Sequence, residues 1–454
     1  MASHGTAHIG TPGGRLTARL TPGVTRETGP GPYPVTGSAP AAASAVPPAQ
    51  VRRDMRLFWC AGTCDALGSQ MSGLVLPLLL LSLGQTPAEV GAVAGLCAAA
   101  TLVLGPFAAV PADRGARKQV MVGAALVSAA AMTGVALAVR SGAVPLAVLI
   151  GAVLVERSAT SCYEAASLGT VALVCPPEQH RRVLSRLQAG ERGALVLGPA
   201  LGGMLFQAGR WLPFLADALS YAVAAGCIRA LRTELSPPRE QRPAGSPRRT
   251  WRAAAAEAGA GVALIRREPL LRLALGWLSA VNALLVALYY TTVFALQGSG
   301  AAGPGLVLAL AGAAGLAGAL LAPRLAGRRS PTRVLVAVSW LMVPPAAALA
   351  AARDAWQFGL LFGLLCLLTP LATVALQARI IQVTPPGLQA RTGTVLATAS
   401  GAAAALAPAL AGLAADRAGP ATTLVGCAVL LAAVALHATW AAPALTRRTE
   451  EEPV

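Results

Sequence analysis

The sequence predicts an all-α polytopic membrane protein with twelve transmembrane helices in two sets of six. Hydrophobic residues make up 55% of the 454 residues and charged residues only 12%, about half the charged share of a typical soluble domain. The mean hydropathy is +0.61. Apolar stretches long enough to cross the hydrocarbon core, which takes about 20 residues, recur between Met55 and Leu445 with short polar breaks. A secreted or cytosolic enzyme is thereby excluded.

The first six helices are expected at residues 55–83, 87–111, 118–139, 143–174, 184–208 and 212–232. Thr86 and Glu89 have the spacing of a capping box at the start of the second helix, with Pro87 at its first position. Residues 1–50 are rich in Gly, Pro, Ala, Ser and Thr and hold no apolar run long enough for a signal peptide. We expect a disordered cytoplasmic tail over 1–50 and an N-terminal bundle over 51–232.

A polar segment separates the two sets of helices. Residues 233–252 carry Pro, Gly, Ser and clustered Arg, the composition of a solvated linker. An amphipathic surface helix is expected at 251–267, so the cytoplasmic linker covers 233–267. The last six helices are expected at 269–296, 304–326, 333–352, 355–382, 389–414 and 420–441. They form a C-terminal bundle over 268–445, followed by a cytoplasmic tail over 446–454.

Basic residues outnumber acidic residues by 36 to 19, which gives a net charge of +17. In a soluble protein this excess would suggest nucleic acid as a partner. Here most cations lie in loops on one side of the predicted membrane, and the opposite loops keep only Arg140, Arg210, Arg353 and Arg417. By the positive-inside rule both termini are cytoplasmic. We expect a multi-pass protein of the cell (inner or plasma) membrane. Its partner is the lipid bilayer, and we expect no nucleic acid to bind.

The polar residues predict neither an enzyme nor a metalloprotein. The eight cysteines and four histidines are scattered without the spacing of metal ligands. The sequence has no G-x-x-x-x-G-K-[ST] phosphate loop and no catalytic constellation. We therefore expect a carrier without catalytic residues, metal or other cofactor.

A short turn between the second and third helices carries one acid and three cations. Asp113, Arg114, Arg117 and Lys118 resemble the G-x-x-x-D-R-x-G-R-[KR] loop of the major facilitator superfamily, with alanines in place of its two glycines. The resemblance implies two pseudo-symmetric six-helix bundles around a central cavity, with the Asp latching the outward-facing state. The alternative is a plain positive-inside turn.

The fifth helix resembles the antiporter motif of the same family. Gly198, Pro199, Gly202 and Gly203 reproduce its G-P-x-x-G-G core, and residues 57–84 are similar to the first helix of the drug- and macrolide-exporter branch. The resemblance implies export of an amphipathic small molecule, such as a drug or antibiotic, by proton antiport through alternating access. We expect a monomer. For the motif, the alternative is a kinked helix whose small residues serve only packing. For the function, the alternative is an importer or facilitator of a small metabolite on the same fold.

Few ionisable residues lie within the predicted helices, where each costs about 2.5–3.5 kcal/mol to insert. Asp65 lies near the midplane of the first helix. It is either the carrier of the coupling proton, with Arg157 competing for that proton, or a cavity carboxylate satisfied by water or by the fourth helix. Glu156 and Arg157 are adjacent in the fourth helix and point about 100° apart, so we expect each to face a different partner. They are either proton-relay and substrate-anchoring groups or members of structural ion pairs.

The remaining polar positions have simpler expected roles. Glu164 in the fourth helix and Arg192 in the fifth should lie at similar depth, which predicts a structural ion pair. Asn282 in the seventh helix, followed by Tyr289, Tyr290, Thr291 and Thr292, offers an amide, phenols and hydroxyls to the substrate cavity. The alternative for the two tyrosines is anchoring at the membrane interface. Asp217 is expected to cap the sixth helix at the external face.

Overall fold

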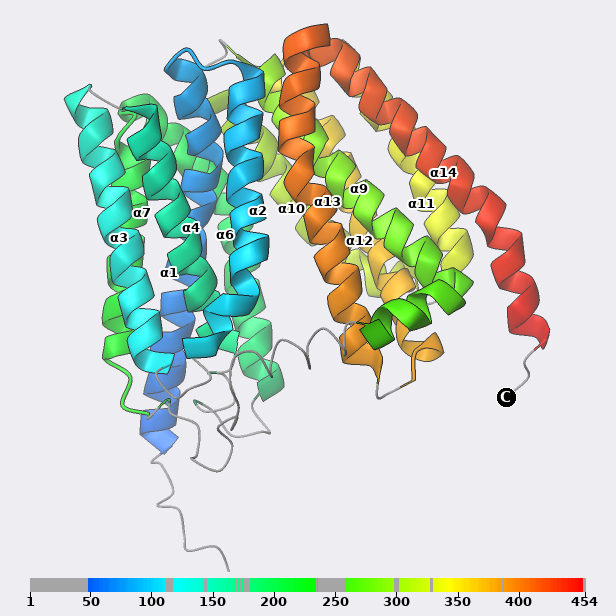
Figure 1. The fold of residues 1–454 in the computed structure, drawn as a ribbon, viewed down its shortest axis with the longest axis horizontal. Coiled ribbons are helices and arrows are strands. Elements are labelled where there is room, and N and C mark those ends of the chain that lie inside the picture. Colours follow the sequence, from blue (N-terminus) through cyan, green and yellow to red (C-terminus); the bar gives the residue numbers. More distant parts are fainter. Residues whose placement is uncertain are drawn as a thin grey trace, which may run out of the picture. The chain divides into compact units, whose positions relative to one another are not determined.

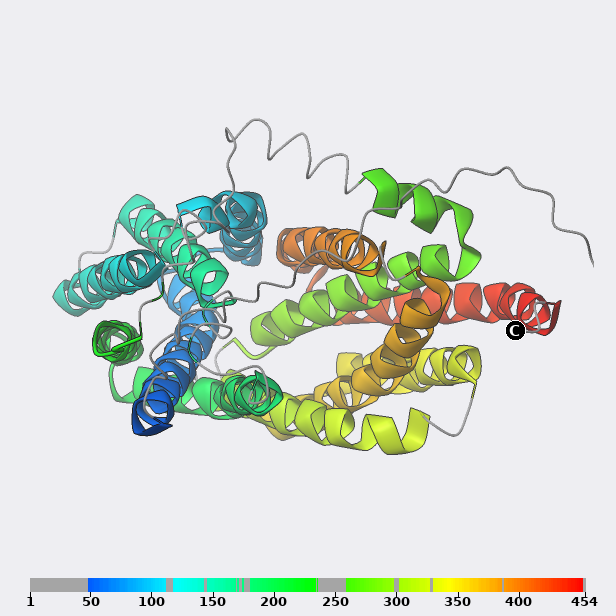
Figure 2. The ribbon, with the colours of Figure 1, turned by 90° about the horizontal axis from the view of Figure 1, so that it is seen from below.

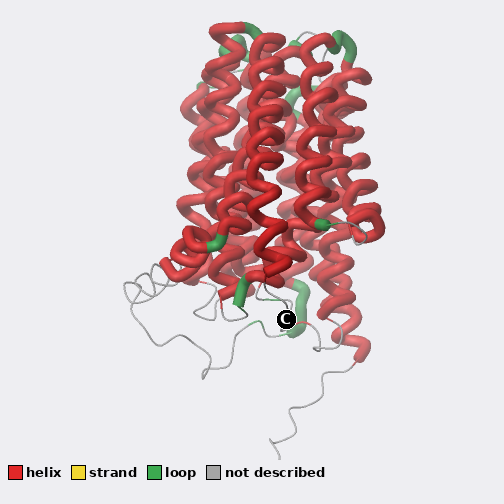
Figure 3. Tube along the Cα trace, turned by 90° about the vertical axis from the view of Figure 1, so that its right-hand side faces the viewer, coloured by secondary structure: helices red, strands yellow, loops and turns green. Residues whose placement is uncertain are grey.

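A computed structural model describes residues 48–111, 117–142, 145–168, 180–233, 259–297, 302–326, 330–385 and 388–451, together with 170, 174 and 235. Within these residues the chain is helical and has no strand, as Figure 3 shows. By its contacts, the chain from Pro47 to Val454 is one compact unit. The prediction of an all-α protein is confirmed.

Twelve long helices account for most of the described residues. They are α1 (Pro48–Ser82), α2 (Pro87–Pro111), α3 (Arg117–Ser141), α4 (Leu146–Leu168), α6 (His180–Ala208), α7 (Leu212–Arg229), α9 (Pro269–Ala295), α10 (Ala302–Ala326), α11 (Pro331–Ala348), α12 (Ala355–Val383), α13 (Gln389–Ala418) and α14 (Pro420–Glu451). A short 3-10 turn, η4 (Leu349–Ala351), extends α11. By length and composition, 11 of these helices are able to cross a membrane. The exception among them is α6, whose first half carries Arg186, Glu191 and Arg192.

The first six helices pack against one another. Helix α1 contacts α6 and α7, α3 contacts α4 and α7, and α2 contacts α4. Figure 2 shows them, coloured blue to green, together on the left. Phe58, Met121 and Ile228 belong to one buried apolar cluster of this half, and Leu79 and Phe214 belong to another.

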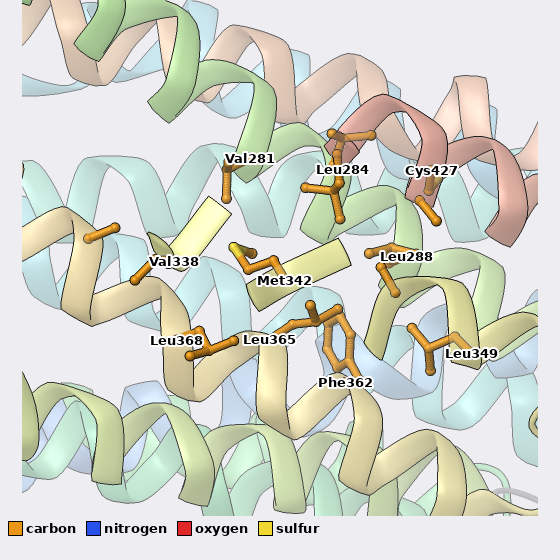
Figure 4. Packing of buried hydrophobic residues seen from close by; sticks show 14 of the residues in the cluster. Val281, Leu284, Leu288, Val338, Met342, Leu349, Phe362, Leu365, Leu368 and Cys427 are labelled. Atoms are coloured by element: carbon orange, nitrogen blue, oxygen red, sulfur yellow. The ribbon is translucent and has the colours of Figure 1, made fainter. Parts of the chain in front are cut away.

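The last six helices enclose a core of their own. Helix α9 packs against α13 and α14, α10 against α12, and α11 against α12 and α14. Figure 4 shows Val281 of α9, Met342 of α11 and Phe362 of α12 in this core. The buried indole of Trp277 donates its N–H to Ser339 Oγ at 2.8 Å. This bond satisfies the only polar atom of a large apolar side chain.

The two sets of helices meet along two pairs, α2 with α13 and α6 with α10. Glycines let these backbones approach closely. A Cβ atom at Gly412 would lie 3.1 Å from Gly91 Cα, and one at Gly312 would lie 2.9 Å from the carbonyl oxygen of Leu195. Lipid gives apolar helices no hydrophobic reason to associate, so close packing of small residues supplies the attraction.

The glycine contact between α2 and α13 lies at one end of the helices. Gly91 is in the second turn of α2, and Gly412 is close to the end of α13. Figure 1 shows that α1 begins and α14 ends at the opposite end. The chain from Pro48 to Glu451 therefore enters and leaves the helical region on the same side.

Some helix boundaries differ from those predicted. Helix α1 begins at Pro48 rather than at 55, because proline is well suited to the first helical position. Helix α4 is shorter than the predicted 143–174 and starts after Pro145, whose carbonyl accepts the amides of Val148 and Leu149. Helix α14 continues through most of the predicted tail, to Glu451, since its last residues are good helix formers.

Two local predictions can be compared with the structure. The capping box is confirmed, because the Thr86 amide donates to Glu89 Oε2 at 2.8 Å and the Glu89 amide donates to Thr86 Oγ1 at 3.3 Å. Residues 259–267 of the predicted surface helix are helical. The rest of that segment and most of the predicted linker lie outside the described residues.

We expect Gly412→Ala to destabilise the protein, because the new Cβ would overlap the carbonyl oxygen of Pro87 and crowd Gly91 Cα. Overpacking of this kind costs about 1–3 kcal/mol. Gly123→Ala is the matched control, since nothing lies within 4 Å of a Cβ there. The thermal unfolding midpoint of the purified protein measures both. Equal midpoints for the two variants would contradict the close packing of α2 and α13.

Candidate functional site

A cavity of about 400 Å³ lies where the two sets of helices face each other. Helices of the first set form most of its wall, and Tyr290 of α9 and Gly401 of α13 complete it from the second set. The wall is largely apolar, but it includes the charged pair Glu156 and Arg157 of α4. The volume is within the range of small-molecule sites, about 300–1,000 Å³.

Glu156 and Arg157 are bound to each other, so the expectation that they face different partners is wrong. Arg157 Nη2 donates to Glu156 Oε1 at 2.7 Å, and Arg157 Nε donates to Glu156 Oε2 at 2.5 Å. The Arg side chain is long enough to reach around the helix surface to its neighbour. The carboxylate is 2% exposed and the guanidinium side chain 29%. The pair therefore presents its positive member to the cavity.

Two hydroxyl groups complete the environment of Glu156. Tyr221 of α7 donates its O–H to Glu156 Oε1 at 2.5 Å, and Thr160 donates to the same oxygen at 3.0 Å. Tyr221 also lies 3.1 Å from Ser69 Oγ of α1. The network links α1, α4 and α7. A buried charge needs such a full set of partners.

Asp65 lies on α1, and its side chain is buried in the protein, with 8% of its surface exposed. Its Oδ1 has no hydrogen-bond partner among the described residues. Asp217, Glu156 and Glu164 are its acidic neighbours by electrostatic interaction, and Arg157 is its cationic neighbour. Asp65 is not among the residues that line the cavity.

Asn282 holds two helices together outside the cavity wall. Its Nδ2 donates to Ser400 Oγ at 3.2 Å and to the Ser400 carbonyl at 3.4 Å, and this joins α9 to α13. Tyr290, one of the phenols that follow it, lines the cavity. The ring of Tyr289 packs edge-on against that of Tyr290, with centroids 5.0 Å apart.

The predicted ion pair between Glu164 and Arg192 is absent from the described part of the chain. Both side chains are exposed, and the salt bridge recorded there is that of Glu156 with Arg157. Their helices, α4 and α6, are not a main contact pair, because α1 packs against α6 and α4 packs against α2 and α3. The expected similar depth of the two side chains was therefore not enough to predict a contact.

The antiporter-like motif lies at a contact of three helices. A Cβ atom at Gly202 would lie 3.1 Å from Met71 Cα of α1, and one at Gly198 would lie 3.3 Å from the Leu67 carbonyl oxygen. On another side of α6, Gly203 and the Pro199 carbonyl approach Gly305 of α10. The motif residues therefore let α6 pack closely against helices from both sets. Their role in transport stays a prediction.

The loop motif is only partly described. Asp113 and Arg114 lie outside the described residues, so the predicted latch stays a prediction. Lys118 Nζ donates to the Leu231 carbonyl at 2.7 Å, at the end of α7. Arg117 has an interaction of its own.

The sequence predicted no role for Asp54 and a wrong role for Asp217. Asp54 near the start of α1 is buried, and its Oδ2 accepts hydrogen bonds from the amides of Arg232 and Thr233 and from Thr233 Oγ1, at 2.7–3.1 Å. Asp217 was predicted to cap α7, and this prediction is wrong. The N-cap is Trp211, and Asp217 is fully buried within the helix. The helix begins at Leu212, so Asp217 falls in the second turn and turns inward. The sequence feature that could have indicated this position is the three-residue spacing of Asp217 and Ser220, which places the two side chains on the same face of the helix.

Comparisons with known proteins agree with the fold. One curated relative, described as a chloramphenicol resistance protein of Streptomyces lividans, is 30% identical over 319 residues, which covers 67% of this chain and 76% of the relative. Among solved structures, a bacterial homologue of the human lysosomal transporter Spinster, inward-facing and unoccupied, aligns with a TM-score of 0.68 and 14% identity over 88% of this chain and 98% of its own. The nucleoside transporter NupG aligns with a TM-score of 0.67 and 11% identity over 86% and 98%.

The sequence also matches the family model of the Major Facilitator Superfamily over residues 58–408. This match covers most of the helical region, including every residue that lines the cavity. The multi-pass helical fold and the central cavity are those of a small-molecule carrier rather than an enzyme. The chain belongs to the Major Facilitator Superfamily of membrane transporters.

Proposed function

We propose that this transporter exports an uncharged or weakly charged amphipathic molecule of antibiotic size in exchange for protons. The observation that carries the proposal is the cavity itself, an apolar wall with one charged pair at its side. Glu156 already balances the charge of Arg157. A substrate therefore needs no full charge of its own.

The chemistry of the cavity favours a ligand with hydrogen-bond acceptors. Arg157 uses Nε and Nη2 for Glu156, and its Nη1 has no partner among the described residues. A guanidinium carries five N–H donors, so several remain for a ligand. Tyr290 adds a phenol to the opposite wall, and Phe214 and Leu76 add apolar surface. Chloramphenicol has this character, and the relative at 30% identity is described by its resistance to that compound.

Support for export comes from sequence and packing together. The G-P-x-x-G-G motif resembles that of antiporters, and the resistance phenotype of the relative is the one expected of an exporter. The glycine contact of α2 with α13, at Gly91 and Gly412, lies at the end opposite the start of α1. If the termini are cytoplasmic, this contact closes the cavity to the outside, the conformation in which an exporter binds its cargo.

The candidate for proton coupling within this proposal is Asp65. A buried carboxyl in a membrane protein is a functional site by default, because its insertion is costly. The unpartnered Oδ1 leaves room for a proton or a water molecule. Arg157 forms its ion pair with Glu156. It would therefore oppose protonation of Asp65 by the electrostatic effect of its positive charge and not by a direct hydrogen bond.

Expression in an efflux-deficient host tests the function. We expect the transporter to raise the chloramphenicol concentration that stops growth and to lower accumulation of the compound. Arg157→Lys keeps the charge but loses the forked geometry. Loss of one charged hydrogen bond costs about 1.5–3 kcal/mol, so affinity should fall roughly ten- to hundredfold. Gly123→Ala is the control, and equal growth with and without the transporter across a panel of amphipathic antibiotics would reject the proposal.

Asp65→Asn tests the coupling. The variant should still exchange chloramphenicol across proteoliposome membranes but should no longer accumulate it in response to an imposed pH gradient, because the amide cannot bind and release a proton. Transport is measured with and without the gradient at equal protein content. If the variant responds to the gradient as fully as the wild type, Asp65 is not the carrier and Glu156 becomes the next candidate.

Reporter fusions after Arg140, Arg232 and Leu445 test the orientation. We expect periplasmic reporter activity only at Arg140, because the loops on the side of the other two positions carry most of the cations. Periplasmic activity at Arg232 or Leu445 would invert the topology and, with it, the direction in which the cavity opens.

A further inference from the structure

Asp217 occupies a closed space between α7 and α1. Its side chain is fully buried, and Gly68 lies opposite it on α1. A Cβ atom at position 68 would overlap Asp217 Oδ1 and Ser220 Oγ and would lie 3.0 Å from Ser220 Cβ. Asp65, Gly68 and Ser72 are three and four residues apart, so they share the face of α1 that meets α7. The glycine is what makes room for the carboxyl group.

If Asp217 were ionised, neither of its carboxylate oxygens would accept a short hydrogen bond from the described residues. Ser220 Oγ lies 2.7 Å from the backbone carbonyl of Asp217 and 3.4 Å from Oδ1. A hydroxyl has one hydrogen, and the shorter bond uses it. Ser72 also approaches the carboxyl, but its Oγ is shared with the carbonyls of Gly68 and Ser69 at 3.3 and 3.4 Å. Oδ2 has no partner among the described residues.

Glu156 provides the contrast within the same half of the protein. Four hydrogen bonds reach its two oxygens, from Arg157 Nε and Nη2, from Tyr221 and from Thr160. The single nearby guanidinium is thus engaged by Glu156. A proton on Asp217 would supply a donor for the lone pairs of Ser220 Oγ, whereas a charge there would be buried without compensation.

The charged and titratable groups around Asp217 come from α1, α4 and its own helix. Asp65 faces it from α1, Glu156 and Arg157 from α4, and Tyr221 from its own helix. The charged residues of α3 lie in its first and last turns, and α6 carries no charged residue after Arg192. Acidic neighbours therefore outnumber the one cation.

We propose that Asp217 is a proton-binding residue of this transporter and that it holds a proton in the conformation described here. The proposal extends the proposed proton antiport. Tyr221, one turn further along α7, links this site to the cavity, because its hydroxyl contacts Ser69 of α1 and donates to Glu156. Entry of water between α1 and α7 would let the carboxyl ionise and release the proton.

Infrared difference spectroscopy of the protein in liposomes tests the proposal without any substrate. A neutral carboxylic acid has a carbonyl stretch that is distinct from that of a carboxylate and shifts in heavy water. We expect such a band at neutral pH. Asp217→Asn, which keeps the size of the side chain, should remove the part that Asp217 contributes, which appears in the difference between the wild-type and variant spectra. Asp217→Glu should shift the band rather than remove it, and it serves as the second variant if the amide variant does not fold.

Glu89→Gln is the matched control, because Glu89 is exposed and glutamine can keep the capping box. Its spectrum should equal that of the wild type. A wild-type spectrum without the band, or a band of equal intensity in the wild type and in Asp217→Asn, would overturn the proposal. The outcome is independent of the transport assays. A band assigned to Asp217 in a protein that shows no proton-coupled efflux would reject the proposed antiport and leave the proton site standing.

Discussion

The ion pair between Glu156 and Arg157 is the interaction around which the first half of the transporter is organised. Two charges within apolar helices are stable only when each finds partners, because removal from water costs more than an isolated charge recovers. Here the pair is formed within one helix, and α7 contributes Tyr221 as a further donor. Ser69 of α1 contacts the same phenol. The relative position of three helices is thus fixed by one charged group at the wall of the cavity.

A second constraint acts between the two sets of helices. Carriers of this fold must change the way their halves touch, so the interface has to be close enough to seal and weak enough to part. Glycine meets both conditions at Gly91, Gly412 and Gly305, where backbone contacts replace interlocking side chains. Such contacts gain dispersion energy over a small area and require no side chain to change rotamer when they separate.

The acids of the first half divide by the number of donors around them. Glu156 accepts four hydrogen bonds and Asp54 accepts three. Among the described residues, Asp217 accepts only the one from Ser220 at 3.4 Å, and Asp65 Oδ1 has no partner. Several hydrogen-bond donors are the expected condition of a structural carboxylate, and a buried carboxyl with few donors points toward a change of protonation. The number of hydrogen bonds therefore distinguishes structural carboxylates from candidate proton sites, although the sequence shows both simply as acidic residues within apolar helices.

Much of the fold could be predicted because the bilayer imposes a length and a hydrophobicity on every spanning segment. The capping box at Thr86 and Glu89 was equally accessible, since its bonds are local to four residues. Boundaries were less accurate where the helix extends beyond the apolar stretch, as at Pro48 and at the end of α14. There the sequence marks the edge of the membrane and not the end of the helix.

The sequence by itself determined the class of the protein, the order of its helices and which residues would be costly in lipid. Only the tertiary structure decided how those residues are paired. Arg157 turned back to Glu156, Arg192 did not meet Glu164, and Asp217 faced α1 instead of capping its helix. The physical reason is that hydropathy depends on each residue separately, whereas a partner depends on which helices are neighbours, how they are rotated and where a glycine such as Gly68 leaves space.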